Sequence, residues 1–406
     1  MAADVLEVLL GGRPIGALTP LNGDRSVFSF TDAYADDAAR PTLSLSFKDA
    51  HGGLIRDFNH PQTRLLPFFS NLLPEGSLRD YLAKRANVKV VREYPLLEVL
   101  GPDLPGAVTV RPAGAGTVDD EELPEAVPAK PGNGPLRFSL AGVQLKFSAV
   151  EKARGRLTIP ASGAGGDWII KLPSTRFAGV SQNEFSMMKL ASAMGMDVPE
   201  VRLMPLDEIE GLPHGIGKIE EDAFAIRRFD RANNGDLVHI EDFAQVFGIY
   251  PEDKYGKGSY RSIARVLWIE TGEAGIREFI TRLIFNTLIG NADMHLKNWS
   301  LIYPDGRTPQ LAPAYDFLST TVYIPDDSMA LRFGRSKLMT DLSIDEITYM
   351  AAKAGLPETL ARTAALEAVE RFRDVWPRER ANLPVSKDLA AEIERLLAAV
   401  PIASGR

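Results

Sequence analysis

The chain has no cysteine among its 406 residues. Without thiols it forms no disulfide, and it has no Cys-ligated zinc, iron–sulfur cluster or thiol nucleophile. Long apolar runs are also missing, since none reaches the ~18 residues that a membrane-spanning helix needs. The first ten residues lack a basic segment and carry Asp4 and Glu7 among apolar residues, which is not typical of a secretory signal. We therefore expect a soluble, cytoplasmic protein.

Basic residues are outnumbered by acidic ones. Lys and Arg total 46 against 54 Asp and Glu, which gives a formal net charge of −8. Proteins that coat nucleic acid need a surplus of Lys and Arg to bind phosphates, so this chain is not expected to be one of them. Its length predicts two or three domains at about 150 residues each.

The sequence up to about residue 111 predicts an N-terminal α+β domain. Residues 5–10 and 15–18 are strand-like and flank the turn sequence Gly11–Pro14, which predicts a β-hairpin. Alternating apolar residues predict two more strands, at 26–30 and 42–47. Helical segments are expected after them, at 65–73 and, with Ser77 as its N-cap, at 78–86.

A change in composition separates this domain from the rest of the chain. Residues 112–136 are rich in Pro, Gly and acidic residues, which predicts a connector. Beyond it we expect one domain over 137–230 and a mostly helical one over 231–406. The patterns predict strands at 145–150, 156–160, 168–171 and 224–229, a helix at 183–194, and a strand and loop region at 290–321.

A polar segment between an apolar helix and an apolar strand carries the strongest chemical signal. It spans residues 290–298, and another acid, Asp316, follows a short strand. The spacing of Asp293, Asn298 and Asp316 suits phosphoryl transfer. In that reaction one carboxylate accepts the proton of a substrate hydroxyl, while an amide oxygen and a second carboxylate hold Mg²⁺ on the nucleotide. The alternative is a capped loop with solvated acids.

A lysine and a glutamate form a second candidate pair. Lys171 ends the apolar strand pattern at 168–171, and Glu184 opens the next helical pattern. In a cleft, such a lysine binds nucleotide phosphates and the glutamate fixes its side chain. The alternative is a lysine that reaches solvent and a glutamate that interacts favourably with a helix N-terminus.

Three further features are weaker. Residues 138–146 form a small-residue loop before a strand, where a kinase fold would cover the phosphates, but they do not match GxGxxG and a simple turn is the alternative. The run Arg227–Arg231 is expected to be a strand end with solvated charges, or a hinge whose backbone faces adenine. The five histidines form no metal-binding pair and no catalytic triad that their spacing supports.

Together these motifs resemble those of the HipA family, the serine/threonine kinase toxins of bacterial toxin–antitoxin pairs. The resemblance covers essentially the whole chain. It rests on seven motifs in the family's order: Phe68–Gly76, Ser139–Lys146, Ile170–Pro173, Asn183–Glu184, Arg228–Arg231, Gly290–Asn298 and Ala314–Asp316. Each motif is weak by itself, and their order makes the resemblance specific. It implies an α/β, bilobal protein-kinase-like fold with an N-terminal α+β domain and a mostly helical C-lobe.

The resemblance also implies a role for individual residues. Asp293 would be the catalytic base, Asn298 and Asp316 would hold Mg²⁺, and Lys171 would contact the phosphates of ATP. Glu184 would pair with Lys171, and Ser139 would be autophosphorylated. The other ATP-binding positions would be Ala141, Gly142, Val143, Gln144, Leu145, Lys146, Arg227, Arg228, Phe229, His295, Lys297 and Tyr315. Leu145 and Arg227 depart from the family's usual residues, and neither change removes a phosphate or metal ligand.

By this resemblance, the protein is expected to phosphorylate a translation component such as an aminoacyl-tRNA synthetase, and to inactivate itself by autophosphorylation. Its expected partner is a HipB-like helix-turn-helix antitoxin, which would make most of the DNA contacts. Two alternatives stay open. One is a catalytically quiet corepressor subunit, against which the intact Asp293, Asn298 and Asp316 count. The other is a small-molecule phosphotransferase, which would not need the N-terminal domain.

Overall fold

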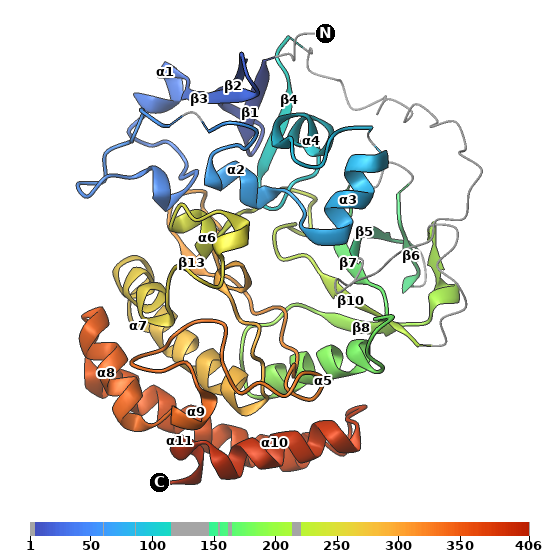
Figure 1. Cartoon of the computed structure of the whole chain (residues 1–406), viewed down its shortest axis with the longest axis vertical. Coiled ribbons are helices and arrows are strands. Elements are labelled where there is room, and N and C mark those ends of the chain that lie inside the picture. Colours follow the sequence, from blue (N-terminus) through green and yellow to red (C-terminus); the bar gives the residue numbers. More distant parts are fainter. Residues whose placement is uncertain are drawn as a thin grey trace.

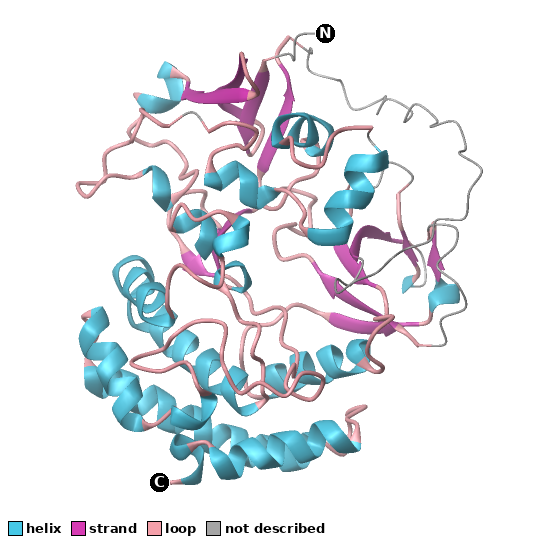
Figure 2. Ribbon diagram, in the orientation of Figure 1, coloured by secondary structure: helices cyan, strands magenta, loops and turns pink. Residues whose placement is uncertain are grey.

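The computed structural model describes residues 5–59, 61–85, 87–114, 146–152, 155–160, 165–212 and 221–405. In these ranges the strands form three sheets, and the long helices of the C-terminal part gather at the opposite end from the N-terminal sheet (Figure 1). Figure 2 shows the same separation of strands from long helices. No helix of the described ranges is long and apolar enough to cross a membrane.

The N-terminal sheet is antiparallel, with the strand order β3-β2-β1-β4. Its strands are β1 (Leu6–Leu10), β2 (Arg13–Leu21), β3 (Arg25–Phe30) and β4 (Val108–Pro112). The predicted hairpin is confirmed as β1 and β2, and the chain turns between them at Gly11 and Gly12, whose φ angles are 56° and 77°. These angles are left-handed, and only glycine adopts them at little cost.

Four helices accompany this sheet: α1 (Asp32–Ala35), α2 (Pro67–Leu72), α3 (Gly76–Arg85) and α4 (Glu93–Leu100). An aromatic core fills the space beneath them, and Phe28, Phe47, Phe68 and Phe69 are among its members. The helix expected at 65–73 is confirmed as α2. The expected N-cap at Ser77 is wrong, because α3 already begins at Gly76.

The strand expected at 42–47 is also wrong. Residues Leu45–Phe47 form a 3-10 helix instead, with Ser44 as its N-cap. The side chain of Ser44 accepts a hydrogen bond from the backbone N–H of Ser46, and buried Glu241 accepts one from the N–H of Leu45 at 3.0 Å. These donors are therefore not available to a strand ladder.

The second sheet has the order β8-β10-β7-β5-β6-β9. Its strands are β5 (Lys146–Glu151), β6 (Leu157–Thr158), β7 (Trp168–Lys171), β8 (Val201–Met204), β9 (Ile209–Glu210) and β10 (Ala223–Arg227). Helix α5 (Val180–Ala193) packs against β8 and β10. It begins three residues before the expected start, so Glu184 lies in its second turn rather than at its opening.

The C-terminal part is mostly helical, as expected. Its small sheet has the order β11-β12-β13, and helix α7 runs through the largest apolar core of the chain. The elements are β11 (His239–Asp242), α6 (Phe243–Val246), α7 (Tyr260–Leu288), β12 (Ser300–Tyr303), β13 (Gln310–Leu311), α8 (Ile344–Ala354), α9 (Glu358–Glu379), α10 (Lys387–Ala399) and α11 (Pro401–Ser404).

Candidate active site

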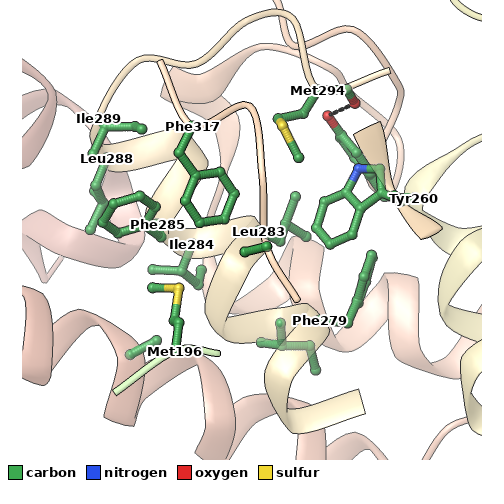
Figure 3. Close-up of a cluster of buried hydrophobic side chains, with 14 of the residues drawn as sticks. Met196, Tyr260, Phe279, Leu283, Ile284, Phe285, Leu288, Ile289, Met294 and Phe317 are labelled. Atoms are coloured by element: carbon green, nitrogen blue, oxygen red, sulfur yellow. Dashed lines mark hydrogen bonds between the residues drawn. The ribbon is translucent and has the colours of Figure 1, made fainter. Parts of the chain in front are cut away.

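Two loops that carry acidic residues are anchored in the core around α7. Asp293 precedes Met294 and Asp316 precedes Phe317, and both apolar side chains are buried. Phe317 packs on an aromatic ring of α7 with the ring centroids 5.0 Å apart, and the hydroxyl of Tyr260 donates to the backbone oxygen of Met294 at 2.8 Å. Figure 3 shows both anchors. Each acid is thereby held at the edge of a rigid core.

Buried Asn291 joins these two loops. Its Nδ2 donates to the side-chain oxygen of Asn286 at 2.8 Å and to the backbone oxygen of Asp316 at 3.1 Å. Asp316 has a φ of 56°, a left-handed conformation that costs a non-glycine residue about 1–3 kcal/mol. The hydroxyl of Tyr315 adds a bond to the backbone oxygen of Lys297 at 2.9 Å. These bonds hold the strained conformation that presents the Asp316 carboxylate.

Lys171, at the end of β7, lies between two carboxylates. Its Nζ is 2.6 Å from Oε1 of Glu184 and also contacts Oδ1 of Asp316. Burial disfavours the ammonium, but Asp316 and Glu184 outweigh it and raise the pKa of Lys171. The structure therefore brings the candidate pair together and adds Asp316 to it.

The ammonium of Lys171 thus contacts two carboxylates, and these two groups differ in their pKa values. Burial alone would raise the pKa of Asp316, but Lys171 and Lys146 lower it to about 2. Burial dominates for Glu184, which is nearly inaccessible, and raises its pKa to about 7. Asp316 is accordingly the carboxylate that stays ionised at neutral pH.

Lys146 begins β5 and pairs in register with Lys171. Desolvation lowers the pKa of Lys146, and Lys171 adds to the effect while Asp316 opposes it. Ser139 and residues 141–145 lie outside the described residues. The phosphate-covering loop and its autophosphorylated serine therefore stay predictions.

Asp293, the expected base, has its carboxylate at the surface of the site. The hydroxyl of Tyr255 donates to its Oδ1 at 2.6 Å, and Nδ2 of Asn298 donates to its backbone oxygen at 2.9 Å. Desolvation by the surrounding atoms raises the pKa of Asp293, and the bond from Tyr255 opposes this shift. A carboxylate with a raised pKa is a stronger base, which suits a group that takes a proton from a hydroxyl.

Asn298 and Asp316 are chemically suited to the expected Mg²⁺. Because Nδ2 of Asn298 already donates to Asp293, its Oδ1 is the atom left to face a cation. The ionised carboxylate of Asp316 supplies a second hard oxygen donor. No group of three or more His, Cys, Asp or Glu side chains in the described ranges is placed to hold a metal. A site built here would consist of one carboxylate and one amide together with phosphate oxygens.

Two of the expected ATP-binding residues, Lys297 and His295, have surroundings that restrict their roles. Nζ of Lys297 is 2.8 Å from Glu75 and donates to the backbone oxygen of Asn71 at 3.1 Å. Burial opposes the charge of Glu75, but Lys297 and Lys254 lower its pKa to about 2. His295 is buried, and desolvation followed by Lys254 lowers its pKa to about 3. His295 is therefore neutral at physiological pH, and Lys297 neutralises an acid of the N-terminal part.

The charges just after β10, on Arg228, Asp230 and Arg231, are largely buried, which corrects the expectation that they are solvated. Arg228 contacts the two carboxylate oxygens of Asp230 at 2.9 and 2.8 Å and Asp103 at 3.2 Å. Arg231 contacts the same two acids at 2.9 Å each. Asp103 lies just before β4, so this network joins the N-terminal part to the second sheet. The guanidinium of Arg228 is thus held by acids.

The neighbours of Arg228 have different surroundings. Arg227 contacts the side chain of Asn233 at 2.9 Å near the surface. The ring of Phe229 lies 5.6 Å from the ring of Tyr315, centroid to centroid. Of the expected ATP-binding residues Arg227, Arg228 and Phe229, the structure brings Phe229 beside the loop of Asp316.

Three residues of the site were missed as functional residues in the sequence. Asn291 and Glu75 lie inside motifs, but their bonds to Asp316 and Lys297 depend on the folded chain. Tyr255 precedes Asp293 by 38 positions and lies in no motif. The loop before α7 contains several polar residues, and no local signal distinguishes Tyr255 from the others.

Two family models match the chain. The HipA N-terminal domain matches residues 6–111, and the HipA-like C-terminal domain matches residues 138–376. The chain belongs to the HipA family. The resemblance inferred from the motifs is therefore confirmed.

Relatives and solved structures agree with this assignment. The chain is 56% identical over 393 residues to "Putative kinase Y4dM" of Sinorhizobium fredii, which covers 96% of this chain and 95% of that one. It is 26% identical over 352 residues to the serine/threonine-protein kinase toxin HipA of Shewanella oneidensis, with 78% and 76% covered. The structure of Shewanella HipA, solved with HipB and operator DNA, matches with a TM-score of 0.75 at 22% identity and covers 98% and 97% of the chains. This match confirms the predicted α/β, kinase-like HipA fold.

Proposed function

We propose that this protein is an ATP-dependent kinase that phosphorylates a serine or threonine of another protein. The observation that carries the proposal is the position of Lys171 between Glu184 and Asp316. Asn291 joins the loop of Asp316 to the loop of Asp293. A phosphate-binding cation, a metal-binding carboxylate and a base are the groups that phosphoryl transfer requires. Relatives named as kinases support the same activity.

Each group has a definite task in this reaction. Asp293 accepts the proton of the substrate hydroxyl. The oxygen of that hydroxyl forms a bond to the γ-phosphorus of ATP, while the bond between this phosphorus and the oxygen of the leaving ADP breaks. Lys171 binds phosphate oxygens and offsets part of their negative charge. Mg²⁺, when bound by Asn298 and Asp316, would neutralise charge on the phosphates.

We extend the proposal to a toxin role. The Shewanella relative was solved with HipB and operator DNA, which supports a HipB-like helix-turn-helix antitoxin as the partner. Because the chain has a formal net charge of −8, it is poorly suited to bind DNA phosphates, which supports the proposal that the partner makes most of the DNA contacts. The proposed substrate is a translation component such as an aminoacyl-tRNA synthetase, and phosphorylation of Ser139 is the proposed off-switch in the cytoplasm.

The kinase proposal is tested with Asp293→Asn and Asp316→Asn, and Asp388→Asn on the exposed first turn of α10 is the matched control. Each purified full-length protein is incubated with radiolabelled ATP, Mg²⁺ and dephosphorylated casein. We expect the two site variants to lose roughly 100-fold or more in rate and the control to keep it. Unchanged transfer by both site variants would overturn the assignment.

The toxin proposal has separate tests. Incubation of the active protein with ATP is expected to add one phosphate to Ser139 and to weaken ATP binding, as mass spectrometry and calorimetry would show. A phosphate at another position contradicts the off-switch.

Co-expression with a helix-turn-helix protein encoded beside this chain is expected to give a stable complex. Separate elution of the two proteins contradicts the proposed partner.

A further inference from the structure

Tyr255 lies directly beside the expected base. It follows a 3-10 turn (Pro251–Asp253) in the loop before α7, and 49% of it is exposed. Its hydroxyl donates to Oδ1 of Asp293 at 2.6 Å, and its ring meets the ring of His295 edge to face with the centroids 5.0 Å apart. The half-exposed ring is thus held by its contact with His295, and its hydroxyl is bonded to the carboxylate of Asp293.

The carboxylate of Asp293 depends on this bond for its orientation. Among the residues that the structure describes, Tyr255 is the one side chain that donates to it. The other bonds of Asp293 are made by its backbone: its oxygen accepts from Nδ2 of Asn298 and from the N–H of His295, and its N–H donates to Oδ1 of Asn291. A short carboxylate side chain with one oxygen held is restricted to one rotamer, which leaves Oδ2 for a substrate hydroxyl.

Tyr255 is in turn braced by the N-terminal part of the chain. The ammonium of its neighbour Lys254 lies 5.5 Å from the centre of the Tyr255 ring and 2.8 Å from Glu75. The same Glu75 holds Lys297, which lies next to Asn298, at 2.8 Å. The carboxylate of Glu75 therefore restrains two segments: the one that carries Tyr255 and the one that follows Asp293.

We propose that Tyr255 is a positioning residue that holds Oδ1 of Asp293, so that Oδ2 faces the hydroxyl of the protein substrate. This inference rests on the proposed kinase function. It assigns a task to a residue outside every motif of the sequence, and it explains why a half-exposed tyrosine is fixed at this point. A base with a free rotamer would spend part of its time turned away from the hydroxyl, and misplacement by about 1 Å costs up to about 100-fold in rate.

The test compares Tyr255→Phe with Tyr250→Phe, a matched control in the same segment whose hydroxyl donates to the backbone oxygen of Leu65 at 3.1 Å. Phosphotransfer to dephosphorylated casein gives kcat and KM, calorimetry gives the Kd of ATP, and a thermal scan gives Tm. For Tyr255→Phe we expect kcat to fall roughly tenfold, while the KM of casein, the Kd of ATP and Tm stay within twofold or a few degrees of wild type. Tyr250→Phe is expected to keep kcat.

The outcomes separate this inference from the proposed function. An inactive wild type overturns the kinase proposal and the inference with it. An active wild type with unchanged kcat in Tyr255→Phe overturns the inference alone. A rise in kcat with a lower KM also overturns it, because the hydroxyl would then obstruct the substrate. Equal losses of kcat, ATP binding and Tm would identify a merely structural role.

Discussion

The ammonium of Lys171 contacts the carboxylate of Asp316 although the two residues are 145 positions apart in the sequence. Lys171 ends a strand of the second sheet, and Asp316 lies in the C-terminal part beside the core around α7. The contact therefore joins the two parts of the chain at the point where the proposed reaction takes place. It also explains why Asp316 remains ionised although its surroundings are desolvated.

The first prediction concerns this contact. Lys171→Met is expected to weaken ATP binding at least tenfold, because the phosphates lose their cation and the carboxylates of Glu184 and Asp316 are left beside them. Lys189→Met, on the exposed side of α5, is the matched control. Calorimetric titration with ATP and Mg²⁺ measures both. Equal affinities in the two variants would place the phosphates elsewhere.

The second prediction concerns Glu75. Glu75→Gln removes the carboxylate that pairs with both Lys254 and Lys297, so we expect lower stability by about 1–3 kcal/mol and slower phosphotransfer. The pKa of Glu75 is lowered to about 2, so this contribution is fully present at neutral pH and is lost only as the pH falls toward that value. Urea unfolding and the casein assay measure the two effects. Glu252→Gln, at an exposed pair with Arg64, is the control that should change neither.

Local sequence patterns were sufficient to predict the elements that depend on near neighbours. The turn at Gly11 and Gly12 and the strand that ends at Lys171 were both predicted correctly, because hairpin residues and apolar alternation act over a few positions. The motif order was likewise sufficient to identify the family. The position of the candidate base and lysine could thus be expected before the fold was known.

Distant partners explain what the sequence did not predict. The 3-10 helix at Leu45–Phe47 depends on Glu241, which lies 196 positions from the N–H it binds. The burial of Arg228 depends on Asp103, 125 positions earlier. No local pattern contains such partners, so the run Arg227–Arg231 by itself predicts a strand end with solvated charges, or a hinge whose backbone faces adenine.

The third prediction tests whether Arg228 has a structural task. Arg228→Met leaves the buried carboxylates of Asp230 and Asp103 with one arginine instead of two, so we expect stability to fall by about 3 kcal/mol or more. Arg227→Met removes only a surface contact with Asn233 and should cost less than about 1 kcal/mol. Urea unfolding measures both. If Arg228→Met instead weakened ATP binding without loss of stability, its guanidinium would belong to the nucleotide site.

The last prediction concerns Glu241 at the contact between the N-terminal and C-terminal parts. Burial raises the pKa of Glu241 to about 7, although the hydroxyls of Ser44 and Tyr303 donate to it and partly oppose the shift. Between the ordinary value of 4.5 and about 7, the unfolded chain releases this proton while the folded chain keeps it. Stability is therefore lost as the pH rises through this window, by about 3 kcal/mol for a shift of this size.

Glu241→Gln removes this proton from both states and should make the free energy of unfolding depend less on pH. Neighbouring His239 and Asp242 also titrate with shifted pKa values, in opposite directions, so the measured quantity is the difference between variant and wild type at pH 5 and pH 7.5. We expect wild type to lose more stability than the variant between these values. Glu370→Gln, on the exposed face of α9, is the control, and its free energy of unfolding should change with pH as that of wild type does. Parallel pH profiles of wild type and Glu241→Gln would show that Glu241 is ionised in the folded protein, because its bonds to Ser44, Leu45 and Tyr303 would then outweigh its burial.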